Sequence, residues 1–191
     1  MKKVVWLSVL LVVSLFTPVH ATDYVIDSAK AHASIGFRIQ HFGFSWLHGR
    51  FNRFEGTFSY DAEKPQDASV DVTIEVASID TNYEMRDKHL QSSDFFNASV
   101  FPQARFVGKS LHKKDGGSYI LSGLFTLHGI TNPLTMTVEK VGEGESPWGG
   151  YRAGFEGHTH FTIADYGIDV TRLGPSAEQV YLTLSIEGVR Q

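Results

Sequence analysis

Large apolar residues recur at every second position in several long stretches of this chain, and this alternation restricts its fold more than any other feature. The pattern is clearest over residues 35–39, 70–76, 134–138 and 180–186, where polar or small residues fill the positions between. Successive side chains of a β-strand point to opposite faces, whereas a helix repeats about every 3.6 residues. Each stretch therefore predicts a strand with one buried face and one face in water.

The spacing of these stretches predicts strands that run antiparallel to their neighbours. Turn-forming sequences such as Asp115-Gly116-Gly117 and Gly129–Pro133 separate the strands, and short connections favour antiparallel neighbours. Residues 83–96 lack the strand pattern and predict one short helical segment, with Asn82 capping its start. We expect strands near residues 23–27, 32–40, 49–60, 69–79, 103–113, 118–128, 134–141, 151–164 and 178–188.

Long strands with a single apolar face build either a sandwich of two sheets or a closed barrel. Several of the stretches reach ten or more residues, or roughly 33 Å at ~3.3 Å per residue, which suits the tilted strands of a barrel better. From eight or nine such strands, we predict an all-β fold, an eight-stranded antiparallel β-barrel. With about eight strands, the interior holds either packed side chains or one small ligand.

Aromatic rings and glycines are concentrated in residues 32–58, whose sequence is HASIGFRIQHFGFSWLHGRFNRFEGTF. These rings do not share one parity, so they do not all face the same side, and any single ring there is compatible with ordinary core packing. As a group, large rings alternating with glycine fill space poorly and favour the wall of an apolar channel over a solid core. The candidate channel residues are Ile35, Phe37, Ile39, Phe42, Phe44, Trp46, Phe51, Phe58, Val72, Ile74, Leu134, Met136, Phe155, Leu182 and Leu184.

The first 21 residues have the features of a secretory signal peptide. Lys2 and Lys3 precede an apolar run over residues 4–16, and Val19 and Ala21 are the small residues that a signal peptidase reads. The run is shorter than the ~20 residues that a spanning helix needs, and no later segment is suited to spanning a membrane. We expect cleavage after Ala21 and export to the periplasm of residues 22–191 as a single domain.

Composition argues against a disulfide-stabilised domain and against a nucleic-acid-binding protein. The chain contains no cysteine, so the exported fold uses no disulfide. Its formal net charge is −4, and removal of Lys2 and Lys3 with the leader makes it more negative, which argues against nucleic acid as a partner.

Two clusters of polar residues are candidates for chemistry. His158 and His160 share one face of a strand and are suited to a transition metal, but no carboxylate or cysteine lies near them at a repeating ligand spacing. The charged stretch of residues 80–90 is compatible with acid–base catalysis, or with a solvated helix that Arg86 or Asp87 fastens to a neighbouring strand. For both clusters we favour a structural role on a solvated surface over chemistry. The sequence contains no nucleophile motif or nucleotide-binding loop. We therefore expect no catalytic residue, metal or cofactor.

Several longer stretches, in the same order along the chain, resemble one known family. These stretches are DYVIDSAKAHASIGFRIQHFGFSW, GRFNRFEGTFSYD, SIDTNYEMRDKHLQSSDFF, FPQARF, GLFTLHGITNPLTMTV, SPWGGYRAGFEG and YLTLSIEG. Over residues 23–191 the chain resembles the YceI family of exported, lipocalin-like proteins. The resemblance implies an antiparallel β-barrel around a long apolar channel that binds polyisoprenoid chains, including isoprenoid quinones, and other long lipids such as fatty amides. Ala164 stands where many members have an arginine, so no head-group role of that arginine transfers to this chain.

Three functional hypotheses follow from the sequence and this resemblance. The leading one is a periplasmic binding or carrier protein for a long apolar lipid, most of all a polyisoprenoid or isoprenoid quinone. The second is an enzyme that acts on a lipid head group through residues 80–90. The third is a structural or partner-binding barrel with a solid core. A homodimer is compatible with all three.

Overall fold

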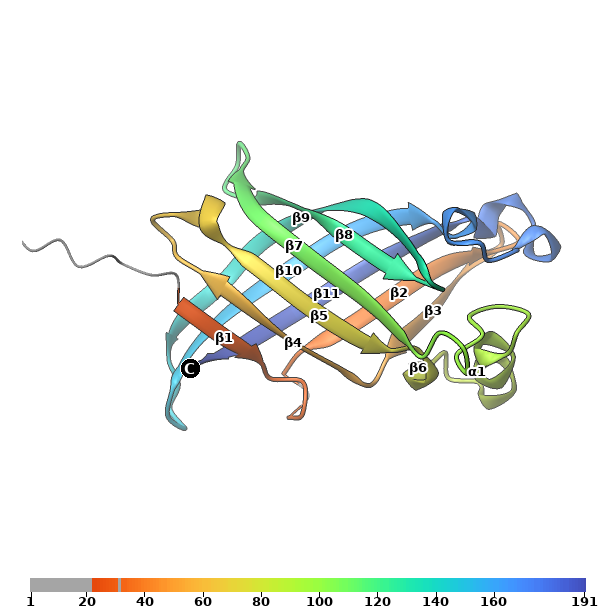
Figure 1. The fold of residues 1–191 in the computed structure, drawn as a ribbon, viewed down its shortest axis with the longest axis horizontal. Helices are drawn as coiled ribbons and strands as arrows, with labels where there is room; N and C mark the ends of the chain where they lie inside the picture. Colours follow the sequence, from red (N-terminus) through yellow and green to blue (C-terminus); the bar gives the residue numbers. More distant parts are fainter. Residues whose placement is uncertain (1–21, 31) are drawn as a thin grey trace, which may run out of the picture.

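The computed structural model describes residues 22–30 and 32–191, so the predicted leader, residues 1–21, lies outside the described part of the chain. Within that part, eleven strands form one antiparallel sheet that closes into an elongated barrel (Figure 1). The strands are β1 (Thr22–Ile26), β2 (Ser34–His41), β3 (Ser45–Phe51), β4 (Phe54–Tyr60), β5 (Ser69–Glu75), β6 (Ile79–Asp80), β7 (Gln103–Lys113), β8 (Tyr119–Leu127), β9 (Ile130–Glu145), β10 (Tyr151–Thr162) and β11 (Gln179–Arg190). The helices are α1 (Glu84–Gln91) and the short 3₁₀ turns η1 (Pro65–Asp67), η2 (Val76–Ser78), η3 (Ile163–Tyr166), η4 (Thr171–Leu173) and η5 (Pro175–Ala177).

Eight strands form the closed ring, in the order β1-β4-β5-β7-β8-β9-β10-β11, and pairing of β1 with β11 completes it. Strand β11 pairs with β10 along one edge, and its other edge is long enough to pair with two strands. Its first half, residues 181–185, pairs with β2, and its last residues pair with β1 through Ile26 and Gly188. Strands β2, β3 and β6 extend the wall toward the end of the barrel where α1 lies (Figure 1). The predicted all-β, eight-stranded antiparallel barrel is confirmed.

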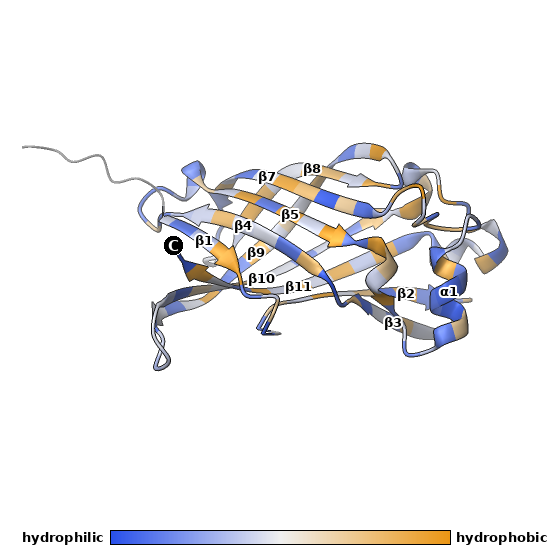
Figure 2. Ribbon diagram, turned by 60° about the horizontal axis from the view of Figure 1, so that its bottom comes forward, coloured by the Kyte–Doolittle hydropathy of each residue, from blue (hydrophilic) through white to orange (hydrophobic). Residues whose placement is uncertain are grey.

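The alternation of the sequence matches the two faces of the wall. In β5, Val72 and Ile74 are buried, whereas Asp71 and Arg105 of the neighbouring strand form an ion pair on the outside. Figure 2 shows apolar and polar residues following one another along β5 and β7. Burial of the apolar set on one face holds the strands in register, because a slip of one residue would turn that set outward.

The stretch expected as one strand over residues 49–60 is two strands, β3 and β4, and β3 begins earlier than predicted. The interruption has a local cause. The Asn52 N–H donates to the carbonyl oxygen of Ser78 over 3.1 Å, and the Arg53 N–H donates to the Ser78 hydroxyl over 3.0 Å. These two backbone donors therefore leave the ladder of the sheet.

The connection between β8 and β9 is shorter than the expected turn over residues 129–133. His128 and Gly129 alone make the turn, with φ values of 51° and 76°. Positive φ at both central residues is the geometry of the tight hairpin turns that match the twist of paired strands. Strand β9 therefore starts at Ile130.

Helix α1 is shorter than the predicted segment of residues 83–96, and the expected Asn82 cap is wrong. The helix begins at Glu84, with Tyr83 in the N-cap position and no capping bond from its side chain. Asn82 instead has a φ of 60°, and its N–H donates to Asp80 over 2.9 Å. The turn before the helix is thus fixed by the carboxylates of Asp80 and Asp87, the second of which accepts the Thr81 N–H over 2.9 Å.

An ion-pair network joins the corner between β1 and β2 to the end of the barrel opposite α1. The carboxylate of Asp27 accepts a hydrogen bond from the Arg152 guanidinium over 2.8 Å and lies 3.0 Å from Nδ1 of His32. Arg152 also donates to Glu187. The hydrogen bond from Arg152, followed by the one from His32, holds the pKa of Asp27 below its usual range.

We expect Asp27→Asn to lower the melting temperature by a few degrees at neutral pH and to have almost no effect in strong acid. A lowered folded-state pKa stabilises the protein above the unfolded value of about 3.9, and this contribution is lost as pH falls through the folded value. Thermal melts of both proteins across this range test it. Asp115→Asn, which removes the same charge from the exposed β7–β8 turn, is the control. Equal destabilisation by Asp27→Asn at both extremes of pH would contradict the expectation.

Candidate ligand-binding cavity

The barrel encloses two adjoining cavities. The inner cavity, of about 110 Å³, lies among β1, β2, β4, β5 and β7 to β11. The mouth cavity, of about 270 Å³, lies toward α1 and is also lined by β2, β3 and the connection between β10 and β11. Both are lined by Ile35, Ile74, Phe125 and Leu182, which therefore mark the boundary between them.

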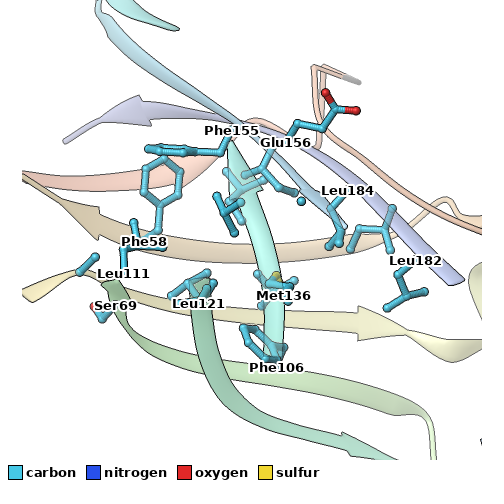
Figure 3. A pocket seen from close by; sticks show the side chains of 18 of the residues that line it. Phe58, Ser69, Phe106, Leu111, Leu121, Met136, Phe155, Glu156, Leu182 and Leu184 are labelled. Carbon is cyan, nitrogen blue, oxygen red and sulfur yellow. The ribbon is translucent and has the colours of Figure 1, made fainter. Parts of the chain in front are cut away.

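The inner cavity presents almost only apolar side chains to its interior. Figure 3 shows Phe58, Phe106, Leu121 and Met136 converging on it, whereas the carboxylate of Glu156 points away. Phe58 is fixed by a stacked contact with Tyr24, with ring centroids 4.8 Å apart, and by an edge contact with Phe155 at 5.6 Å. Tyr60 brings no charge, because burial and its hydrogen bond with Tyr119 raise the pKa of its phenol.

Close approach of rings to bare backbone explains the mixture of aromatics and glycines in the sequence. A Cβ added to Gly49 would lie 2.3 Å from Cζ of Phe37, its partner across β2 and β3. A Cβ added to Gly188 would lie 2.4 Å from Cε1 of Phe58. Each ring thus lies against the wall where a glycine leaves space for it. Rings that lie against the wall in this way leave room in the centre of the barrel.

Most of the predicted channel residues line a cavity. The mouth cavity is lined by Ile35, Phe37, Ile39, Phe51, Ile74 and Leu182, and the inner cavity by Ile35, Phe58, Val72, Ile74, Leu134, Met136, Phe155, Leu182 and Leu184. Their contact with a ligand stays a prediction, but their common placement follows from the parity of the strands that carry them.

The predicted lining is wrong at three positions, because the structure places Phe42, Phe44 and Trp46 outside both cavities. These residues are 49%, 86% and 39% exposed. Phe42 and Phe44 lie in the turn between β2 and β3, where strand parity does not apply. In β3 it is Leu47 that lines the mouth cavity, so Trp46 faces outward, where the Arg38 guanidinium lies 4.3 Å from its ring.

The sequence analysis missed the residues that complete the mouth cavity beyond the strands. Leu90, Phe95 and Phe96 come from α1 and the turns after it. Others come from the link between β10 and β11, where residues 163–177 form three 3₁₀ turns. The apolar pair Phe95-Phe96, which follows a charged segment in the sequence, was the signal that could have identified them. The residues from the link are Ile163, Val170, Leu173 and Ala177.

Polar side chains line the mouth cavity at its outer edge. They are Gln40, His41, Arg86 and His89, and the exposure of both histidines shows that the cavity reaches the surface between the β2–β3 turn and α1. Arg86 donates from Nε to the Thr81 hydroxyl and from Nη2 to the Thr81 carbonyl, each over 2.7 Å. Arg86 and Asp87 thus fasten α1 to the residue that follows β6, which agrees with the structural interpretation of this charged stretch.

The two histidines considered for a metal lie on the outer face of β10, away from the cavities. His158 Nε2 is 3.4 Å from Glu156, and His160 stacks on Tyr181 with ring centroids 5.7 Å apart. Within the described residues, the one group of three possible metal ligands is elsewhere and consists of Asp27, His32 and Glu187. Arg152 is bound to both carboxylates of that group, so a guanidinium already occupies the position of a cation.

Comparison with known proteins finds a matching family model and closely similar relatives. A family model described as the YceI-like domain matches residues 24–188. A UPF0312 protein of Shewanella baltica (strain OS185) is 49% identical over 187 residues, which is 97% of this chain and 97% of the relative. No helix within the described residues is long and apolar enough to cross a membrane.

Solved structures share the fold. The YCEI protein of Campylobacter jejuni is 25% identical, with a TM-score of 0.69 over 80% of this chain and 90% of that one. BcnA of Burkholderia cenocepacia is 22% identical, with a TM-score of 0.75 over 85% of this chain and 98% of that one. A polyisoprenoid binding domain from Saccharophagus degradans is 12% identical, with a TM-score of 0.64 over 90% of this chain and 100% of that domain.

Proposed function

Because the chain belongs to the family of YceI-like domains, we propose that it is a periplasmic binding or carrier protein for a long apolar lipid, foremost a polyisoprenoid or isoprenoid quinone. The observation that carries the proposal is the pair of adjoining cavities. Together they extend along the interior of the barrel, and their lining is almost wholly apolar. A lipid chain fits such a space because it needs shape and dryness rather than polar partners. The named ligand class of the polyisoprenoid binding domain supports this choice.

Burial alone provides enough free energy for useful affinity. Removing ~400 Å² of a lipid chain from water contributes about 10 kcal/mol gross, at ~25 cal/mol per Å². Several kcal/mol are then lost in ordering a flexible ligand. Binding in the micromolar range or tighter is therefore within reach without a charged contact.

The lining of the cavities supports lipid binding over catalysis on the lipid. One solved structure with the same fold is described as a polyisoprenoid binding domain. Among the described residues that line the inner cavity, there is no histidine or inward-pointing carboxylate that could transfer a proton to a bound chain. The location in the periplasm is proposed from the leader of residues 1–21. Release of that leader would give a protein that begins at Thr22.

Extraction of the purified protein with organic solvent tests the proposal. We expect mass spectrometry to find a prenyl or other long-chain lipid in the extract of protein recovered from the periplasmic fraction, and an intact mass that corresponds to residues 22–191. A chemically modified head group would favour the enzyme hypothesis instead. An empty extract from a protein that also fails to take up added lipid would favour a barrel with a solid core.

A further inference from the structure

Side chains that carry positive charge are distributed unevenly along the interior of the barrel. The residues that line the mouth cavity include Gln40, His41, Arg86 and His89 but no aspartate or glutamate. The inner cavity has one charged lining residue, Glu156, whose carboxylate points away from it (Figure 3). The hydroxyl groups of Ser59, Tyr60 and Ser69 are neutral, so among the described lining residues positive charge lies only toward α1.

Arg86 is the member of this set that is both charged at neutral pH and held in position. Two of its five N–H groups are used, by the hydroxyl and the carbonyl oxygen of Thr81. Thr81 is itself only 5% exposed and is fixed by Asp87, which accepts its N–H and its hydroxyl. The guanidinium therefore has a defined orientation before any ligand arrives.

The remaining donors of Arg86 are not taken up by an acid. Within the described part of the chain, no carboxylate oxygen lies within the 4.0 Å of a salt bridge to Arg86, although other arginines such as Arg50, Arg53 and Arg152 do form such pairs. A partly buried guanidinium at the edge of an apolar cavity is a strong donor to carboxylate or carbonyl oxygen.

We propose that Arg86 binds the head group of the lipid, with the tail directed into the inner cavity. The barrel then prefers single-chain lipids whose head presents acceptor oxygens, most strongly a carboxylate, over lipids of equal length with a cationic head. This inference rests on the proposed lipid-binding function and adds to it the chemistry of the head and the direction of the bound chain. A quinone carbonyl satisfies the same donors as a neutral acceptor.

Competition with a neutral fluorescent apolar probe measures the preference in the unaltered protein. Hexadecanoate, methyl hexadecanoate and hexadecylammonium have tails of the same length and differ in the head. We expect hexadecanoate to displace the probe at least about tenfold more tightly than hexadecylammonium, since a hydrogen bond to a charged group is lost with the second. The ester should fall between them.

Variants at α1 and at η4 assign the preference to Arg86. Arg86→Gln should reduce the difference between hexadecanoate and hexadecylammonium to less than about twofold, and Arg86→Lys should retain part of that difference. Arg172→Gln is the matched control, because it removes an exposed positive charge from η4, next to Leu173 of the same cavity. This control should keep the full preference. Thermal melts confirm that each variant is folded.

The direction of the chain is tested with fatty acids that carry a nitroxide near the carboxylate or near the methyl end. Trp46 lies in β3 on the outer side of the wall at the α1 end, so the label near the carboxylate should quench it more. Quenching of Trp46 is obtained by subtracting the quenching that remains in the Trp46→Phe variant from that of the wild-type protein.

Each outcome separates the inference from the function on which it rests. If no chain displaces the probe and the probe itself does not bind, the lipid-binding function is wrong. If all three chains bind the wild-type protein equally, or if the methyl-end label quenches Trp46 more, lipid binding stands and the head-group role of Arg86 is overturned. The wild-type comparison does not depend on whether Arg86→Gln folds.

Discussion

Replacement of Leu182 by tryptophan is expected to abolish binding of a long lipid while leaving the barrel folded. Leu182 lies on β11, lines both cavities and is only partly buried, so its side chain faces open space at their boundary. An indole there would separate the inner cavity from the mouth. Losing ~200 Å² of buried chain removes about 5 kcal/mol gross, so the affinity should fall by at least about 100-fold.

Displacement titrations and thermal melts of the same samples measure this effect. Leu124→Trp, which adds the same indole at a 53% exposed position of β8, should bind lipid as the wild type does. A Leu182→Trp protein that binds normally would show that the ligand does not cross the boundary between the cavities. A protein that loses much of its stability would place Leu182 in a packed core, where overpacking costs about 1–3 kcal/mol.

Gly123→Ala is expected to destabilise the barrel more than any conservative change on its surface. A Cβ at this position would lie 2.5 Å from the carbonyl oxygen of Val107 and 2.8 Å from Cα of Gly108, both in the backbone of β7. Strand β7 is held on its other side by β5, so it does not move away freely. The expected loss of stability is about 2–3 kcal/mol. For a protein of this size, that is a fall of roughly 5–10 °C in melting temperature.

Gly142→Ala is the matched control for this change, because a Cβ at Gly142 meets nothing within 4 Å. Its effect should stay within about 0.5 kcal/mol, as for most surface substitutions. Denaturant unfolding of the two variants and the wild type gives both values. Equal stability of the two variants would mean that β7 and β8 separate without cost, which would contradict the close approach of these strands.

Strand parity accounts for how well the wall of the barrel was predicted from the sequence. Within residues 70–74 of β5, 134–138 of β9 and 180–186 of β11, every second residue is large and apolar, and those residues line the cavities. Hydrophobic burial acts on each strand separately, so the pattern is visible without knowledge of the neighbours. The closure of β1 on β11 has no such local signal and was inferred only from strand length and number.

The candidate site was predicted less well where the backbone geometry of a turn, rather than strand alternation, determines where a side chain lies. Phe42 adopts a φ of 50° in a turn, so the parity of β2 does not extend to it or to Phe44. The Asn82 cap was wrong because the carboxylates of Asp80 and Asp87 take the backbone donors before α1. The mouth of the cavity is built by side chains that come together only in the folded chain, such as Arg86 and Leu173.

Calorimetric titration of lipid-free protein with a prenylated quinone tests most directly whether the barrel is a lipid-binding cavity. The cavities predict saturation at one ligand per barrel, with a negative heat-capacity change from burial of apolar surface. The same titration with Leu182→Trp should give no saturable heat. Wild-type protein that shows no saturable heat at any temperature, and no displacement of an apolar probe, would contradict lipid binding by this barrel.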